Sequence, residues 1–305
     1  MIEEPMSPSP AVSRVAREDI LARLTAKPVT TRTPFSVRFP SLKPAILFTR
    51  RAHTAVKLAL DPHLATTKSA DPLPYRLYQH QSLLLRKLGA SDMRLQHNKI
   101  KNLKQSTASI TGVVIRPGEV FSLWKLVGEM SRRKGYVDGM LLSRGKIIEG
   151  LGGGMCQLAN LLHWMFLHGP FEIIERYHHS LDVFPDSGRT VPFGSGATIL
   201  YNFVDLKAKN TSKDPIQINL WVTEDKLHGE LRTTNPDLEG FRIKETDHCF
   251  VLWQNQWYRY NRLWRVSRNR NKHLVSELVV TNLAPVLYEI DEEKMKAEGY
   301  TMLHL

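Results

Sequence analysis

The stretch "GLGGGMCQLANLLHWMF", residues 150–166, decides how the middle of the chain folds. Four of its first five residues are glycines, and each glycine costs roughly 0.5 to 1 kcal/mol relative to alanine inside a helix or strand. The glycines therefore predict a turn with positive φ angles or close backbone approach. After the turn we expect a helix from about Gln157 to Leu167, which Gly169-Pro170 ends. Cys156 then belongs to the first turn of this helix.

The glycine run matches neither of the common nucleotide-binding loops. A phosphate loop requires Ser or Thr after Gly-Lys, but Gly145-Lys146 is followed by Ile147. The third glycine of a G-x-G-x-x-G loop is replaced by Met155. With both patterns excluded, we expect no cofactor.

A thiol in the first turn of a helix has the geometry of a cysteine nucleophile. The free N–H groups and the dipole favour the thiolate, and the same turn can supply oxyanion donors. His163 is seven residues further on, about 10.5 Å along the axis, and does not touch the sulfur of Cys156. His178 and His179 lie on the strand predicted after the helix, where neighbouring side chains face opposite ways, so at most one of them points at the thiol.

Three carboxylates are candidates to orient that imidazole: Glu175, Asp182 and Asp205. Two alternatives for Cys156 stay open. A cysteine at the base of an apolar helix also occurs as an inert small hydrophobic residue. A zinc site built from Cys156, His163 and one of the two later histidines lacks the paired spacing of zinc ligands, so we expect no metal. Cys249, in "TDHCFVLW", is expected to be a buried strand residue.

Composition and charge bound the class of protein. The 305 residues are 42% hydrophobic and carry a formal charge of +12, with two basic runs at 76–104 and 259–272. Such runs attract nucleic acid, an anionic membrane surface or phosphorylated metabolites. The chain shows no signal peptide and no apolar run of about 18 residues, so we expect a cytoplasmic protein that is at most peripheral to a membrane.

The order of patterns predicts an α+β fold with a mixed sheet, a buried helix after the glycine turn, N-terminal helices and a small C-terminal β meander. We expect a hairpin around residues 143–146 and helices at 15–24, after Pro44, at 77–88 and at 92–109. Four parts follow: a proline-rich mobile arm at 1–44, a basic helical lead-in at 45–109, a core domain at 110–234 and a strand-rich extension at 235–305.

From about Tyr75 to Thr234 the chain resembles the VanW family, accessory proteins of some vancomycin-resistance gene clusters. The resemblance rests on "YRLYQHQSLLLRKLG", "PGEVFSLWKLVG", "RRKGYVDGM", "GLGGGMCQLANLLHWM", "IERYHHSLDVFPDSGRTVPFGSGAT" and "YNFVDL". It implies a link to glycopeptide resistance or the cell envelope, without a settled biochemical role. It also selects His179 over His178, because His179-Ser180 occupies the His-Ser position of the family, and it supports Glu175, Arg176 and Asp205 as site residues.

Three functions follow, and the sequence leaves open whether the chain is an enzyme. The first is an accessory factor that hydrolyses or transfers an amide of a peptidoglycan-type peptide. Its nucleophile is Cys156, its base His179, its orienting group Asp205 or Glu175, and its oxyanion donors Gln157 or backbone amides.

The second function is a non-catalytic module that binds an anionic or carboxylate ligand. Its ligand contacts are Gly152, Gly153, Gly154, Arg176, His179 and Ser180. The third function is nucleic-acid binding through the basic runs and the aromatic residues Trp253, Trp257, Tyr258, Tyr260 and Trp264.

Overall fold

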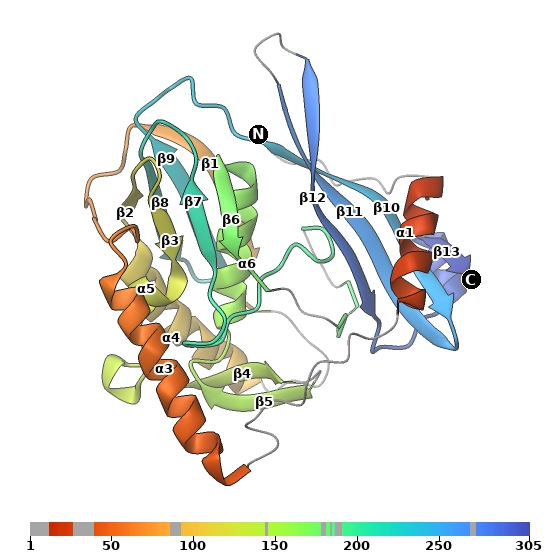
Figure 1. Cartoon of the computed structure of the whole chain (residues 1–305), viewed down its shortest axis with the longest axis horizontal. Helices are drawn as coiled ribbons and strands as arrows, with labels where there is room; N and C mark the ends of the chain where they lie inside the picture. Colours follow the sequence, from red (N-terminus) through yellow and green to blue (C-terminus); the bar gives the residue numbers. More distant parts are fainter. Residues whose placement is uncertain are drawn as a thin grey trace.

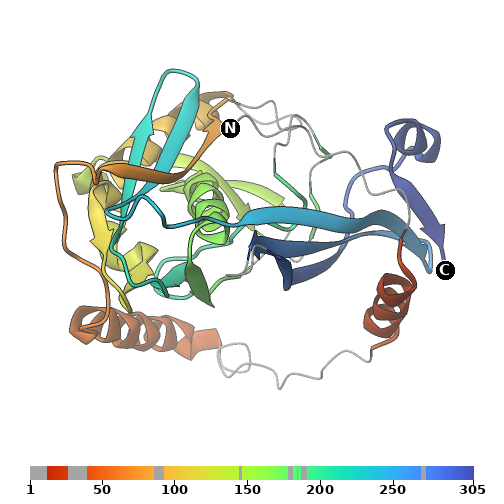
Figure 2. The same cartoon turned by 90° about the horizontal axis from the view of Figure 1, so that it is seen from above.

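A computed structural model describes residues 12–26, 40–85, 93–143, 146–177, 181–183, 185–186, 191–268 and 273–305. These residues form an α+β fold, as the sequence predicts, in which a helical and sheet-containing core unit lies beside a long C-terminal sheet (Figures 1 and 2). The N-terminal helix α1 (Arg14–Thr25) packs on the C-terminal sheet. Among the described residues, no helix combines the length and apolar character needed to cross a bilayer.

The core unit surrounds helix α6 with small sheets. Its elements are η1 (Pro40–Leu42), α3 (Lys43–Leu60), β1 (Tyr75–Leu83), α4 (Met93–Ile110), β2 (Val113–Ile115), β3 (Val120–Ser122), α5 (Leu123–Val127), η2 (Arg132–Lys134), β4 (Asp138–Ser143), β5 (Lys146–Leu151), α6 (Met155–His168), β6 (Phe171–Glu175), β7 (Lys207–Asn210), β8 (Ile216–Val222) and β9 (Lys226–Thr233). The strands form the sheets β1-β9-β8-β2 and β3-β7-β6 and the hairpin β4-β5. Helix α6 starts and ends within two residues of its predicted bounds.

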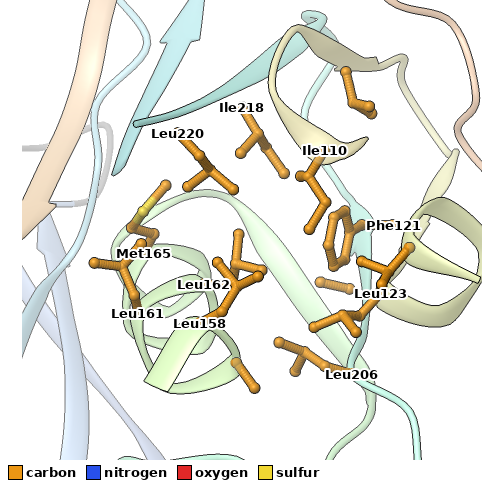
Figure 3. Close-up of a cluster of buried hydrophobic side chains, with 14 of the residues drawn as sticks. Ile110, Phe121, Leu123, Leu158, Leu161, Leu162, Met165, Leu206, Ile218 and Leu220 are labelled. Carbon is orange, nitrogen blue, oxygen red and sulfur yellow. The ribbon is translucent and has the colours of Figure 1, made fainter. Parts of the chain in front are cut away.

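The core is apolar because α6 is hydrophobic around most of its circumference. Leu158, Leu162 and Met165 are fully buried, and they meet Ile218 from β8 and Phe121 from β3 (Figure 3). Strand β9 alternates buried and half-buried residues along its length, as expected for a strand with one face in the core. Each fully buried large aliphatic side chain contributes about 1.5 to 3 kcal/mol, so this packing fixes the position of α6.

The predicted helix at residues 77–88 is wrong. Residues 75–83 form strand β1, which pairs antiparallel with β9 from Tyr75↔Thr233 to Leu83↔Lys226. Local apolar spacing indicated a helix, but β9 exposes unpaired backbone groups that only a strand can satisfy. The expected helical lead-in therefore contains a sheet edge, while the helices predicted after Pro44 and at 92–109 are confirmed as α3 and α4.

The C-terminal unit is one long sheet of order β12-β11-β10-β13. Its elements are β10 (Arg242–Trp253), β11 (Gln256–Arg268), β12 (Leu274–Pro285), α7 (Glu292–Ala297) and β13 (Thr301–His304). This sheet is mixed, because β10 and β13 pair in parallel while β10, β11 and β12 pair antiparallel. We had expected the mixed sheet in the central domain. The named strand pairs of the core unit are antiparallel. Cys249 is a buried residue of β10, as predicted.

Helix α1 ties the N-terminal region to this sheet. Ala16 and Ile20 are fully buried against a cluster that includes Val251 and Tyr260. The backbone N–H of Ser13 donates to Asp247 Oδ1 at 2.7 Å. Part of the expected mobile arm, residues 12–26, is thus packed on the C-terminal sheet.

A buried arginine joins the two units. Arg259 of β11 is 1% exposed and donates to Asp182 Oδ2 at 3.3 Å and to Asp186 Oδ1 at 3.1 Å. Tyr288 Oη also donates to Asp182, at 3.0 Å. Phe193 lies under the guanidinium, whose central carbon is 4.9 Å from the ring centroid. Asp182, a candidate to orient the histidine, therefore binds the C-terminal unit.

Candidate functional site

The glycine turn has the backbone geometry that the sequence predicts. Gly152 has φ +74° and Gly154, the N-cap of α6, has φ +95°. Gly153 lies so close to Gly139 of β4 that a Cβ at position 153 would be 2.1 Å from the carbonyl carbon of Gly139. The turn therefore serves close backbone packing between β4 and the start of α6.

The N–H groups of the turn all donate within the protein. Gly152 donates to Val137 O at 3.0 Å, Gly153 to Gly150 O at 3.1 Å and Gly154 to Met140 O at 2.8 Å. The side chain of Asn102, from α4, donates to the carbonyl oxygens of both Val137 and Gly153. In this structure the three glycines hold α6 in place, and their expected ligand contacts are occupied by protein groups.

Three polar side chains of α6 form a line on one side of the helix, which we call the α6 polar stripe: Cys156, Asn160 and His163. Asn160 and His163 bond to the backbone of the segment at residues 195–199, and Cys156 lies near Ile199 of the same segment. The backbone N–H of Ile199 lowers the pKa of the Cys156 thiol. The N–H of Ala197 donates to Asn160 Oδ1 at 2.8 Å.

His163 completes the stripe as a neutral donor. Its Nδ1 lies 2.7 Å from the carbonyl oxygen of Ser195. Because a carbonyl only accepts, Nδ1 carries the proton. Burial is the main cause that lowers the pKa of His163 to about 3, and Arg176 adds to the effect. The ring is therefore neutral at pH 7, and its N–H group holds the segment at Ser195.

Arg176 holds the same segment from the other side. It donates to Gly196 O through Nε at 3.0 Å and through Nη2 at 2.8 Å, and it also bonds to Gly194 O. The next residue, Tyr177, accepts from the N–H of Thr198 at 2.6 Å. Burial lowers the pKa of Arg176 to about 10, but the guanidinium stays charged at pH 7. The segment at residues 194–199 is thus held between α6 and the chain that leaves β6.

The thiol of Cys156 is protonated at neutral pH. The side chain keeps part of its surface exposed, yet burial raises its pKa, and the N–H groups of Ile199 and of Cys156 itself lower it by less. This net direction is opposite to the one we expected from the helix N-terminus. The physical reason is that desolvation of a thiolate outweighs the favourable dipole of the first helical turn.

Glu175 and Asp205 are brought together, in a network around the N-terminus of α5. Glu175 accepts from the N–H of Asp205 at 2.9 Å and from Lys207 Nζ at 2.7 Å. Asp205 accepts from Ser122 Oγ at 2.5 Å and from the N–H of Trp124 at 3.1 Å. Burial raises the pKa of Asp205 to about 6 despite these hydrogen bonds.

The remaining candidates lie elsewhere. Gln157 donates through Nε2 to Ser82 Oγ at 2.9 Å and to Leu83 O at 2.8 Å, so it ties α6 to β1. His178, His179 and Ser180 lie outside the described residues. In the part of the chain that the structure describes, no group of three or more His, Cys, Asp and Glu residues could hold a metal ion.

Sequence reasoning missed the partner of the stripe. Helical spacing puts Asn160 and His163 on the same face as Cys156, but the segment "SGATI" that Asn160 and His163 bind, residues 195–199, was assigned to no site. A signal was present, because polar residues spaced at i, i+4 and i+7 on an otherwise apolar helix need buried partners. The structure also explains Gly196, since a Cβ there would lie 2.8 Å from Asn160 Oδ1.

Three arginines of the second basic run make contacts inside the protein. Arg262 pairs with Asp247 at 2.6 Å, and Arg265 donates to the carbonyl oxygens of Leu167 and Phe171. Together with Arg259, these residues place three cations of the run in internal contacts. The surface that we expected to attract nucleic acid therefore has three fewer positive charges.

Comparisons with known proteins give the family. Residues 98–232 match the family model described as VanW like protein. The vancomycin B-type resistance protein VanW of Enterococcus faecalis is 31% identical over 264 residues, which cover 86% of this chain and 96% of that protein. The chain belongs to the VanW family.

A second relative matches over a shorter region. The uncharacterized protein YoaR of Bacillus subtilis is 32% identical over 117 residues, 38% of this chain and 37% of YoaR. No solved structure shows a significant match. The glycine turn, α6 and the segment that its polar stripe holds all lie inside the region of the VanW family model.

Proposed function

We propose that this VanW-family chain is an accessory protein of glycopeptide resistance or cell-envelope metabolism, and that it hydrolyses or transfers an amide of a peptidoglycan-type peptide. Cys156 is the nucleophile. The link to resistance is supported by the name of the Enterococcus relative, a vancomycin B-type resistance protein. The link to acyl transfer is supported by the geometry around the sulfur.

The observation that carries the proposal is the position of Cys156 at the start of α6, where the residue is partly exposed and the backbone N–H groups of Ile199 and of Cys156 itself lie near the sulfur. A nucleophile must be held in place, and the buried helix together with the segment at 194–199 provides rigid support. Asn160 and His163, further along the polar stripe, hold the segment that contains Ile199. This arrangement supports a thiol that is held in position for reaction.

The raised pKa of Cys156 determines how the reaction begins. A thiol that is neutral at pH 7 needs a general base during attack. We assign this role to His179, which follows Tyr177 by two residues. The carbonyl oxygen of Tyr177 accepts from the N–H of Thr198, the residue before Ile199. Glu175 and Asp205 act as positioning residues, because their network anchors the strand that leads to the histidine.

The proposed reaction has two steps. The sulfur of Cys156 attacks the amide carbonyl while His179 accepts the thiol proton. The C–N bond breaks, the proton passes to the leaving amine, and a thioester remains on the cysteine. Water or an acceptor amine then attacks the thioester, gives a proton back through the histidine, and releases the acid or the new amide together with the free thiol.

A synthetic peptide that ends in D-alanine thioester tests this step, because it can acylate a competent cysteine without the difficult amide cleavage. We expect a mass increase on Cys156 in the wild type, at a rate that falls at least about a hundredfold in His179→Ala, within the usual contribution of a general base. Cys156→Ser and Cys249→Ser serve as matched controls: the adduct should be lost in the first and kept in the second.

A non-catalytic binding module is the second candidate, and the raised pKa of Cys156 favours it. In this alternative the thiol is an internal group, and the anionic ligand meets His179 and Ser180. If the wild type forms no adduct while iodoacetamide still alkylates Cys156 at high pH, the thiol is accessible but not catalytic. That result would overturn the first proposal and leave the second.

A further inference from the structure

Helix α3 presents an apolar face to solvent. Three large hydrophobic residues recur every four or eight residues on it and are highly exposed: Phe48 at 73%, Val56 at 56% and Leu60 at 75%. At 100° per residue, they fall on one arc of the helix together with five smaller residues, Ala45, Thr49, Ala52, Ala55 and Ala59, of which only Thr49 is polar. Soluble proteins rarely expose a contiguous apolar face of this kind to solvent.

The opposite face of α3 attaches the helix to the core unit. Leu58 is buried, and Lys125 Nζ donates to its carbonyl oxygen at 2.7 Å. Asn202 Nδ2 donates to the carbonyl oxygen of Arg51 at 3.2 Å. Figure 2 shows α3 along the outer edge of the core unit. The apolar arc therefore points away from the core.

Basic side chains border the apolar arc on α3. Helix α3 contains no Asp or Glu. Arg50, His53 and Lys57 follow one another along one flank, and Arg51 lies on the other. The side chains of Arg50 and Arg51 pass near Phe203, with 5.9 and 5.6 Å from guanidinium carbon to ring centroid. This pattern complements an anionic surface with an apolar interior.

We propose that α3 binds the surface of a membrane containing anionic lipid. The helix lies in the plane of the interface, its apolar arc enters the boundary between headgroups and acyl chains, and its flanking cations contact the headgroup phosphates. The proposal does not depend on Cys156. The membrane contact then lies on α3, whereas the sequence had indicated the basic runs at 76–104 and 259–272.

An anionic bilayer fits this face better than an acidic protein does. Four of the eight residues of the arc are alanines, which form a smooth surface instead of sockets for a specific partner. Because the three large residues span the whole length of the helix, a flat apolar phase contacts all of them at once. The lack of acids on α3 removes any repulsion from phosphate groups.

Flotation of the full chain with vesicles of phosphatidylcholine and phosphatidylglycerol tests the proposal, with pure phosphatidylcholine vesicles as the comparison. We expect binding to the anionic vesicles that weakens as salt shortens the Debye length. Phe48→Glu should weaken the partition coefficient at least about tenfold, because a large apolar group no longer enters the interface. Leu274→Glu, at a residue 70% exposed on β12, should leave it unchanged.

The charge contribution is tested in the same assay. Lys57→Gln should reduce binding to anionic vesicles about fivefold, the effect of about 1 kcal/mol for one cation near the surface. Lys101→Gln, an exposed lysine of α4, is the matched control and should have a smaller effect. Equal losses for the two lysine variants, or equal losses for Phe48→Glu and Leu274→Glu, would overturn the assignment to α3.

Two other occupants of the face give distinct results. If the wild type sediments as a dimer that Phe48→Glu dissociates, the face joins two copies of the chain and the lipid proposal fails. The second of these occupants is another part of the same chain. A polarity-sensitive dye attached to the cysteine of Ala52→Cys detects it, and the wild-type chain treated with the same dye serves as the blank. Blue-shifted emission before vesicles are added would mean that part of the same chain covers α3, which also overturns the proposal.

Discussion

Replacing Gly153 by alanine tests whether the glycine turn exists for backbone packing. The added Cβ would lie 2.1 Å from the carbonyl carbon of Gly139, 2.3 Å from its oxygen and 2.5 Å from the nitrogen of Met140. Carbon atoms that do not bond normally stay about 3.5 to 4.0 Å apart. All three atoms belong to the backbone, so no change of rotamer relieves the contact, and β4 must separate from α6 by more than about 1 Å.

The expected cost follows from this displacement. Overpacking of a filled interior typically costs about 1 to 3 kcal/mol, and a backbone contact belongs at the upper end. We therefore expect Gly153→Ala to lower the free energy of unfolding by about 3 kcal/mol. Gly118 is the matched control, because it has φ +80° and open space where a Cβ would be. Gly118→Ala carries only the conformational cost of a left-handed residue, about 1 kcal/mol.

Urea unfolding followed by tryptophan fluorescence measures both variants, since Trp124 and Trp164 are buried in the core unit. With a slope near 3 kcal/mol per molar urea, the midpoint should fall by about 1 M for Gly153→Ala and by about a third of that for Gly118→Ala. If Gly153→Ala unfolds at the wild-type midpoint, the steric reasoning is refuted. The glycines would then be explained better by contact with a ligand.

Three further outcomes are expected. The raised pKa of Asp205, about 6 against 3.8, means that the folded state holds this proton more tightly than the unfolded state, so stability should fall by about 3 kcal/mol as pH rises from about 4 to 6. In Asp205→Asn that decline should disappear from thermal unfolding curves, and an unchanged pH slope would contradict the assignment. Arg259→Ala should destabilise the protein by about 3 to 5 kcal/mol, because it leaves the buried carboxylate of Asp182 without its cation; calorimetry showing a loss below about 1 kcal/mol would contradict the role of Arg259 in joining the two units. Asn160→Ala should cost about 1 to 3 kcal/mol, since the N–H of Ala197 loses its acceptor, and it should accelerate alkylation of Cys156; an alkylation rate equal to that of the wild type would show that the stripe does not shield the thiol.

Local sequence patterns predicted most of the helices and the hairpin. The glycine turn, the start of α6 and the hairpin β4-β5 were all expected, because positive φ angles, helix termination and short turns depend on a few neighbouring residues. Strand β1 was missed for the opposite reason. Its strand conformation depends on pairing with β9, about 150 residues later in the chain, and no local periodicity records that partner.

The amino-acid sequence by itself determined the α+β class, the VanW resemblance, the place of Cys156 in the first turn of a helix, and the alignment of Asn160 and His163 on the same face. Those features follow from residue type and helical spacing. Only the tertiary structure decided that the segment at 195–199 covers this face, that Arg259 is buried rather than on a basic surface, and that burial outweighs the helix dipole at the thiol. These outcomes depend on which distant groups exclude water from a side chain, because the cost of desolvation is set by the folded surroundings and not by the neighbours in the chain.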